Sequence, residues 1–331
     1  MSNFPQVDLV GVVLNATDTL ITLSSFPEPG SKVEYRDPKF LPGGQVATTV
    51  IACQKWGLTT RYVGKLGDDD AARLHRAAFA AAGVETQLIT VPEAASPQSL
   101  VLIDAKGERT ILGRLDDRLV LQPGDLDREW IVNAKALHVD GHDTAAATLA
   151  AHWAHEAGIP VIADLDELYP GVEELLSLVD YAVVSRDFPT RLMNDPNLES
   201  ALRKMHHRFG AQLTAATLGE GGVLAWNGHR FDHACAYRVA AADTTGAGDI
   251  FHAGFIYGLL QEWPLARQLD FACAAAALNC MAIGARGGIQ SVEAIEQLIE
   301  VGVRYAKTEG YSGLKVADPS LAIPESATPH R

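Results

Sequence analysis

The sequence predicts an α/β fold, in which helices cover both faces of a mostly parallel β-sheet and a small second β-sheet is attached. The apolar run at 7–14 is typical of a strand buried on both faces. From Ala136 onward, strand-like and helix-like segments alternate, which is typical of parallel βαβ units. Short strand-like pieces around turns at 19–35 and 98–112 predict the small sheet. With 331 residues, 47% of them hydrophobic, the chain can bury one large core.

The first half of the chain supplies the start of the main sheet and the whole of the small one. Polar residues 15–18 end the first strand, and a Gly-Gly pair at 43–44 leads into a helix that reaches Lys55 and Trp56. The strand-like pieces expected in the small sheet are 19–22, 32–35, 98–104 and 108–112, with a turn at 105–107. A strand at 60–63 and an alanine-rich helix at 71–83 follow the Gly-Gly helix.

The second half is expected to complete the parallel sheet. Its predicted strands are 137–140, 160–164, 181–185 and 213–217, and a hairpin is expected at 223–226 and 230–232. Its predicted helices are 144–157, 172–178, 250–260, 266–283 and 291–305. Residues 1–311 are read as one domain, with a lid formed by about 15–40 and 97–113. Residues 312–331 are expected to be a poorly ordered tail.

The charge balance argues against polyanionic partners. There are 41 acidic and 27 basic residues, a formal net charge of −14. Nucleic acids and anionic membrane surfaces are bound through basic patches, so neither is an expected partner. A small anionic ligand would have to be held by backbone amides and a metal ion instead.

The cysteines and the hydropathy pattern indicate a cytoplasmic protein. The four cysteines lack metal-ligand or redox spacing and are read as reduced thiols. The chain shows neither a charged-then-apolar leader nor a run of 18 apolar residues.

The stretch Ala242-Asp243-Thr244-Thr245-Gly246-Ala247-Gly248-Asp249 carries the strongest functional signal. It leads into the apolar run 250–260, which predicts a buried helix. The first N–H groups of a helix lack partners and form a site for an anion. Asp249 falls in the first turn, where its carboxylate could take a proton from a hydroxyl. The pattern therefore indicates phosphoryl transfer, although threonine and aspartate also serve as ordinary helix caps.

The run Asp-Thr-Thr-Gly-Ala-Gly-Asp resembles the C-terminal signature of the ribokinase-like (PfkB) carbohydrate and nucleoside kinases. Other landmarks of that family follow in the right order over about 7–306. The resemblance implies a ribokinase-like three-layer αβα sandwich with a β lid. It also implies ATP-dependent phosphorylation of a sugar hydroxyl. Asp249 would be the base, and the amides from Gly246 through Ala247 and Gly248 would hold the transferred phosphoryl group.

The same resemblance implies a set of sugar-binding residues. Asp18 stands where the family has an acid that binds sugar hydroxyls, although an aspartate in a turn is the alternative. Gly43 and Gly44 match the N-terminal Gly-Gly signature. Thr48 departs from the family's usual asparagine and resembles the small hydroxyl residue of some ketose kinases, including the sulfofructose type. The Ser-Arg-Asp run at 185–187 resembles the ketohexokinase-like branch. Further candidates are Asp140 and Arg109, the latter with a solvated hairpin arginine as its alternative.

Nucleotide and cation sites are implied as well. The candidates for ATP are Thr217, Gly219, Gly222, Ala276 and Asn279. A potassium ion is expected at Asp243, Thr245, Ala282 and Gly284. At Ser185-Arg186-Asp187-Phe188 the family usually shows Asn-x-x-Glu, whose glutamate helps to organise Mg²⁺ through water. Mg²⁺ is expected with ATP, but those two residues are absent here.

Two other functions stay open at this point. A nucleoside kinase of the same family would use the same motifs on a ribose. A sugar-binding protein that has lost catalysis is favoured by the missing Asn-x-x-Glu but opposed by the intact Gly-Ala-Gly-Asp. The lid sheet often mediates dimerisation in this family, so a homodimer through the lid is the expected assembly.

Overall fold

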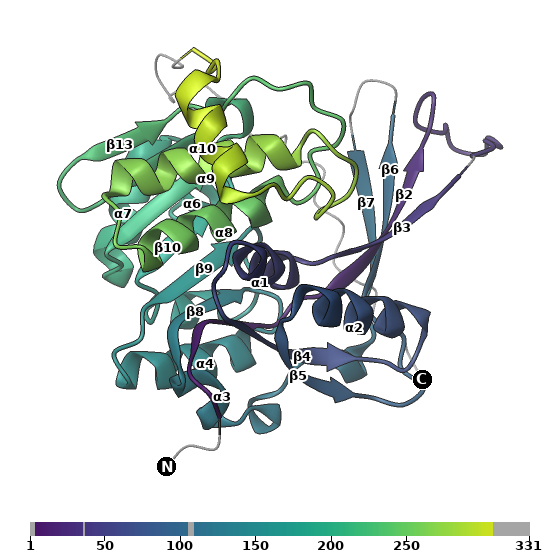
Figure 1. Cartoon of the computed structure of the whole chain (residues 1–331), viewed down its shortest axis with the longest axis horizontal. Helices are drawn as coiled ribbons and strands as arrows, with labels where there is room; N and C mark the ends of the chain where they lie inside the picture. The colour runs from purple at the N-terminus through teal and green to yellow at the C-terminus, as the bar shows by residue number, and fades with distance from the viewer. Residues whose placement is uncertain (1–3, 36, 105–108, 307–331) are drawn as a thin grey trace.

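Nine strands form one large sheet, of which seven are parallel (Figure 1). The computed structural model describes residues 4–35, 37–104 and 109–306, apart from the side chain of Arg109. The order is β13-β12-β11-β10-β9-β8-β1-β4-β5, and only β12 and β13 pair antiparallel. Their bounds are β1 Val7–Val12, β4 Thr60–Leu66, β5 Glu85–Thr90, β8 Ala134–Asp140, β9 Val161–Leu165, β10 Tyr181–Val184, β11 Leu213–Thr217, β12 Val223–Trp226 and β13 Phe231–Ala234.

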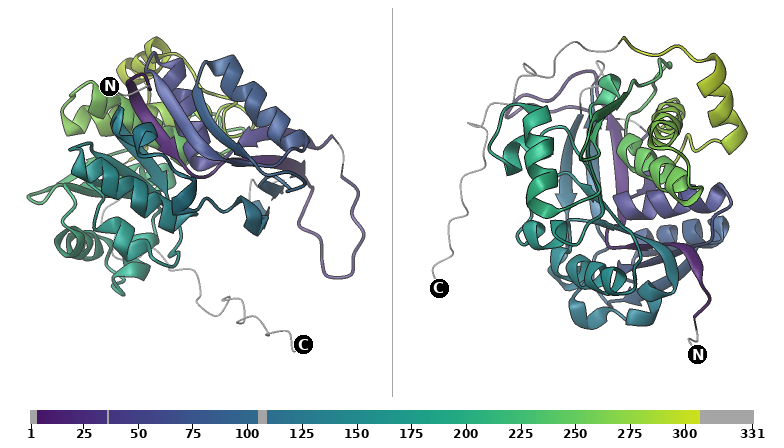
Figure 2. Two further views of the ribbon diagram at one scale, coloured as in Figure 1. Left: turned by 90° about the horizontal axis from the view of Figure 1, so that it is seen from below. Right: turned by 90° about the vertical axis from the view of Figure 1, so that its left-hand side faces the viewer.

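Helices cover both faces of this sheet (Figure 2). Each face has its own apolar core. Alternate residues of a strand enter different cores, as Leu9 and Val10 of β1 do. One layer contains α1 Gln45–Lys55, α2 Asp70–Ala82, α8 Ala247–Leu260, α9 Leu265–Asn279 and α10 Val292–Val301. The other contains α3 Arg128–Val132, α4 Thr144–Glu156, α5 Val172–Leu176, α6 Phe188–Leu192 and α7 Leu198–Phe209. The predicted three-layer αβα sandwich is confirmed.

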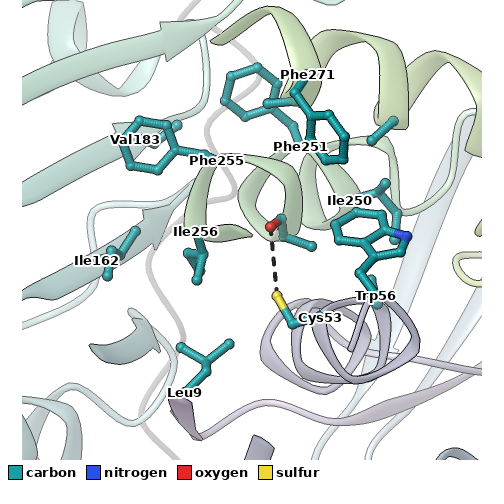
Figure 3. Close-up of a cluster of buried hydrophobic side chains, with 14 of the residues drawn as sticks. Leu9, Cys53, Trp56, Ile162, Val183, Ile250, Phe251, Phe255, Ile256 and Phe271 are labelled. Carbon is teal, nitrogen blue, oxygen red and sulfur yellow. Dashed lines mark hydrogen bonds between the residues drawn. The ribbon is translucent and has the colours of Figure 1, made fainter. Parts of the chain in front are cut away.

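Helix α8 lies at the centre of the first core (Figure 3). Ile250, Phe251, Phe255 and Ile256 are buried in the same cluster as strand residues on the sheet. The Cys53 thiol of α1 lies 3.6 Å from the carbonyl oxygen of Ala253 in α8. The expectation of a buried helix after the motif is confirmed, and this burial fixes where the helix begins.

Four strands form the separate small sheet, hereafter the lid sheet, which projects from the main body (Figure 1). Its order is β3-β2-β6-β7, with bounds β2 Ala16–Thr22, β3 Lys39–Gly43, β6 Gln98–Ile103 and β7 Arg109–Arg114. One expectation was wrong: 32–35 is not a strand, and the third strand is β3. Val33 and Tyr35 are 44% and 54% exposed, so a strand there would have no apolar face to bury.

Several element boundaries also differ from the expected ones. Helix α9 ends at Asn279 rather than 283, and α10 ends at Val301 rather than 305. The side chain of Asn279 bonds to the backbone of Ala285 and Gly288, and these bonds turn the chain away from the helix axis. The predicted turn at 105–107 and tail at 312–331 lie outside the described residues.

Within the described part of the chain, each helix is too short or too polar to span a lipid bilayer.

Candidate active site

The first turn of α8 is open for a ligand. Gly246 precedes the helix in a left-handed conformation, with φ of 75°. A Cβ there would lie 2.5 Å from the carbonyl oxygen of Ala285, so only glycine fits this close approach. Gly248 is exposed, and a Cβ on it would meet nothing within 4 Å. The helical hydrogen bonds begin with Ile250 N–H to Gly246. Of the amides before it, that of Ala247 donates to the Thr244 carbonyl at 3.3 Å, and the others lie outside the helical ladder, where they can meet an anion.

Asp249 is the third residue of α8 and is half-buried. The hydroxyl of Thr49 lies 3.0 Å from the backbone carbonyl oxygen of Asp249. This contact joins the first turns of α1 and α8, although the two residues are 200 positions apart. It brings the Gly-Gly segment that precedes α1 next to the predicted base.

Asp18 lies on β2 of the lid sheet rather than in a turn, and it is 7% exposed. Burial raises the pKa of Asp18 to about 7, and repulsion by the carboxylates of Asp249 and Asp243 adds to this, while Arg286 acts in the opposite direction. Asp249 and Asp243 therefore lie close enough to Asp18 for their charges to act on it. A carboxyl group with this pKa is partly protonated at neutral pH.

The Gly-Gly pair packs directly against Asp18. A Cβ on Gly43 would lie 2.2 Å from Asp18 Oδ2, and one on Gly44 would lie 2.5 Å from Asn15 Cα. Thr48 follows in the first turn of α1 and is fully buried. Its hydroxyl accepts a hydrogen bond of 3.1 Å from Arg286 Nε. The structure therefore brings Asp18, Gly43, Gly44 and Thr48 together beside Asp249.

The other two predicted sugar-binding residues are placed differently. Asp140 ends β8 and is fully buried, and burial raises its pKa. Its two carboxyl oxygens accept hydrogen bonds from the backbone of Leu14 at 2.9 Å and of His142 at 3.0 Å. Asp140 thus connects the carboxyl ends of β1 and β8. Arg109 begins β7, and its side chain lies outside the described residues.

The predicted nucleotide residues follow β11 or lie on α9. Thr217 ends β11, and the Gly-rich turn with Gly219 and Gly222 comes next. Arg186, in the segment that departs from Asn-x-x-Glu, bonds through Nη2 to the carbonyl oxygen of Leu218. This contact connects the exit of β10 to the Gly-rich turn.

The α9 candidates differ in exposure. Ala276 is half-buried, whereas Asn279 is fully buried. The Asn279 amide donates to the Ala285 carbonyl at 3.0 Å and lies 3.4 Å from the Thr245 carbonyl. It also accepts from the Gly288 N–H at 3.1 Å. This side chain ties α9 to the motif loop and to the loop after the helix.

Three of the predicted cation ligands meet directly. One carboxyl oxygen of Asp243 accepts from the backbone and hydroxyl of Thr245, at 2.9 and 2.7 Å. The other accepts from the backbone N–H of Gly284, at 2.8 Å. Ala282 lies two positions before Gly284, in the loop that follows α9.

Sequence reasoning missed several residues that contact the site. Arg286 donates to Thr48 and to the carbonyl oxygen of Gly43, and Thr49 joins α1 to Asp249. Buried His252, one turn after Asp249, lies 3.4 Å from Asp164 and 3.0 Å from the carbonyl oxygen of Val183. The run Gly-Ala-Arg-Gly-Gly at 284–288 could have indicated Arg286. An arginine between glycines, directly after an apolar helix, is not part of a polar surface stretch.

A surface hollow elsewhere holds none of the predicted site residues. It lies along β13 and α9 and is lined by residues that include His233, Cys235, Asp270 and Arg304.

The sandwich, the lid sheet and the acid in the first turn of a glycine-capped helix are together typical of a small-molecule kinase. Residues 8–291 match the model described as pfkB family carbohydrate kinase. Because this match spans most of the sequence, the chain belongs to the pfkB family of carbohydrate kinases. The resemblance stated from the motifs is thereby confirmed.

Curated relatives and solved structures agree with this assignment. The chain is 28% identical to the ATP-dependent ribose-1-phosphate kinase of Halopiger xanaduensis, over 81% of this chain and 90% of the relative. It is 26% identical to the ribokinase of Staphylococcus aureus, over 87% and 98%. The crystal structure of a putative ribokinase from Agrobacterium tumefaciens superposes with a TM-score of 0.82 at 26% identity, covering 89% of this chain and 98% of that one.

Proposed function

We propose that the protein transfers the γ-phosphoryl group of ATP to a hydroxyl group of a sugar. One observation carries the proposal: Thr49 of α1 contacts Asp249 in the first turn of α8, and the Gly-Gly pair just before α1 packs against Asp18. An anion-binding helix end and a hydroxyl-binding carboxylate therefore face one space.

Each residue has a role that its position permits. The Asp249 carboxylate orients the acceptor hydroxyl and takes its proton as the bond to phosphorus forms. The amides of Gly246 through Asp249 stabilise the negative charge on the transferred group. Asp18 and the backbone around Gly43 hold other hydroxyls of the sugar, and the lid sheet keeps water from competing for the phosphoryl group.

ATP, Mg²⁺ and K⁺ are the proposed cofactors. The open space at Gly248 and the Gly-rich turn after β11 fit the phosphates of a nucleotide. Among the described residues, no group of three or more His, Cys, Asp or Glu side chains is arranged to hold a metal ion. That suits Mg²⁺ carried mainly by phosphates and water. K⁺ is proposed beside Asp243, Thr245, Ala282 and Gly284, where the Asp243 carboxylate already joins two loops.

An acceptor panel tests the proposed function. ADP release is measured with ATP, Mg²⁺ and one of D-ribose, D-fructose, ribose 1-phosphate, D-gluconate or adenosine. We expect turnover with at least one sugar. In Asp249→Asn, kcat for that sugar should fall roughly 10²–10⁴-fold, the usual value of a positioned general base. ADP release that never exceeds the rate without acceptor, or an Asp249→Asn enzyme with normal kcat, would overturn the proposal.

We propose a homodimer formed through the outer face of the lid sheet. Phe40, Thr19, Leu100 and Leu112 form one row of cross-strand neighbours on that face. Phe40 and Leu112 at its ends are 63% and 53% exposed. A second copy of the chain would cover this apolar row.

A cytoplasmic location is also proposed. All four cysteines are free thiols, which suits a reducing compartment.

A further inference from the structure

The loop 284–288 holds one arginine between anchored glycines. Gly284 is bonded to Asp243, and Gly288 is bonded to Asn279. The carbonyl of Ala285 accepts from the same Asn279 side chain. With the backbone fixed before and after it, Arg286 has a defined direction of approach to the site.

The guanidinium of Arg286 uses only part of its donor capacity. Its Nε donates to the Thr48 hydroxyl, and its Nη2 donates to the carbonyl oxygen of Gly43. Nη1 is inaccessible to solvent and has no hydrogen-bond partner among the described residues. A buried cationic donor without a partner is costly, so a molecule absent from the free protein is expected to meet it.

Other unpaired polar atoms come from the same neighbourhood. Asn15 Oδ1 and Gln45 Oε1 are buried and lack partners. These residues lie on the segments that flank the Gly-Gly turn, because Gly44 packs on Asn15 and Gln45 follows it. Donors and acceptors are thus both unfilled around one turn, as expected of a chamber that receives a polyhydroxy molecule.

The charges around Arg286 indicate what kind of molecule this is. The guanidinium of Arg286 is a cation at neutral pH, and the carboxylates of Asp249 and Asp18 lie near enough to favour that charge. Asp18 in turn is repelled by Asp249 and Asp243. Two carboxylates thus act on one guanidinium, which leaves little net positive charge to hold a further anion.

We propose that Arg286 is a specificity-determining residue that contacts the acceptor, donating from Nη1 to an oxygen atom of an uncharged sugar across from the Asp18 carboxyl group. This rests on the proposed kinase function. Thr48, in place of the asparagine usual in the family, holds the guanidinium instead of contacting the sugar itself. The alternative is a structural role, in which Arg286 only ties the loop to α1 and Nη1 binds a buried water molecule.

Steady-state kinetics on four variants separate these roles. Arg286→Met removes the donors at similar length, and Arg286→Lys keeps the charge without the planar fork. Thr48→Val removes the anchor at similar volume. The control is Arg267→Met, since Arg267 is exposed on α9 and stacks on Trp263. Acceptors are D-ribose, D-fructose, ribose 1-phosphate and D-gluconate.

We expect the wild-type protein to have a higher kcat/KM for D-ribose or D-fructose than for either anionic sugar. Arg286→Met should raise the KM of the better sugar about 10- to 100-fold, the usual effect of losing a charged hydrogen bond. The KM of ATP should stay within about twofold, since no ATP group is assigned to Arg286. Arg286→Lys and Thr48→Val should give intermediate values, and Arg267→Met should match the wild-type protein.

The pH profile tests the electrostatic coupling between Arg286 and Asp18, whereas the split between the two KM values tests contact with the sugar. Arg286 favours ionised Asp18, so Arg286→Met should shift the inflection of kcat/KM near pH 7 to higher pH. Parallel increases in both KM values, an unchanged sugar KM, or an unshifted profile in folded Arg286→Met would overturn the assignment. If Arg286→Met does not fold, normal sugar KM values in both Arg286→Lys and Thr48→Val would overturn it.

A preference for an anionic sugar would overturn the proposed acceptor class. Absence of turnover with every sugar would instead overturn the kinase function and, with it, this role.

Discussion

Asp18, the proposed sugar-binding residue, lowers the stability of the fold at alkaline pH. Its carboxyl group is buried on a lid strand among other acids, which raises its pKa to about 7. In the unfolded chain the same group would ionise near its ordinary pKa of 3.8. Since the folded state holds the proton more tightly, Asp18 favours folding at low pH, and this contribution is lost as the pH rises through 7.

Substitution of Asp18 by Asn should therefore stabilise the protein at alkaline pH. Asp18→Asn keeps the volume of the side chain and removes its charge. Relative to wild type, we expect the free energy of unfolding to increase by roughly 2–4 kcal/mol more at pH 8 than at pH 4.5. Urea unfolding at the two pH values measures this, with exposed Asp117→Asn as the control. An equal effect of Asp18→Asn at both pH values would contradict a raised pKa.

At the scale of single elements, Asp243 connects the motif loop to the loop that follows α9. Its two carboxyl oxygens bond to Thr245 and Gly284, which lie 39 positions apart in the sequence numbering. A bound K⁺ at this junction would fix the loop that contains Gly246 and hence the first turn of α8. The cation would act on the anion site without touching the substrate.

Activity should accordingly depend on the monovalent cation. At constant ionic strength, we expect kcat to be severalfold higher in K⁺ than in Na⁺ or tetramethylammonium. Asp243→Asn should reduce this difference, because the amide is a weaker ligand and a weaker acceptor. Equal wild-type rates in the three salts would leave Asp243 with only its capping role.

Local patterns predicted the elements but not the contacts between distant ones. The apolar run after the motif predicted α8 because its period and length are local properties. The strand expected at 32–35 failed because β3 is chosen by pairing: Leu41 pairs with Asp18, which in turn pairs with Ser99. Strand choice of this kind depends on partners that the segment itself does not reveal.

For the candidate site too, the sequence predicted the residues in motifs but not the contacts between distant residues. Asp249 and the Gly-Gly pair stand in recognisable motifs, so their place in a candidate site could be predicted from the sequence. Arg286 reaches Thr48 across 238 positions, and spacing within a motif carries no information on such a contact. The sequence likewise did not reveal that both carboxyl oxygens of Asp140 bond to backbone amides.

At the scale of the whole molecule, the lid sheet is the part that we propose contacts a second copy of the chain. It extends away from the sandwich in the views of Figures 1 and 2. Its outer row begins and ends with the exposed side chains Phe40 and Leu112. In an isolated chain this apolar row would face water, which is unfavourable by about 25 cal/mol per Å² of apolar surface.

Charges on this row should separate the proposed dimer. We expect light scattering of the wild-type protein to give the mass of two chains, and Phe40→Asp with Leu112→Asp to give one. Val303→Asp is the control, because Val303 is 65% exposed on another part of the molecule. Wild-type protein that is monomeric at micromolar concentration would exclude this interface.

The loop 284–288 has contacts in two directions, and this constrains the thermodynamics of the enzyme. Gly284 bonds to Asp243 on one side, and a Cβ on it would lie 2.5 Å from Leu41 of the lid sheet. Arg286, two positions later, reaches Thr48 and Gly43. If a monovalent cation at Asp243 tightens sugar binding through this loop, linkage requires the sugar to tighten cation binding by the same factor. The affinity for potassium, measured with and without sugar, would then show whether the acceptor site is occupied, although potassium itself does not touch that site.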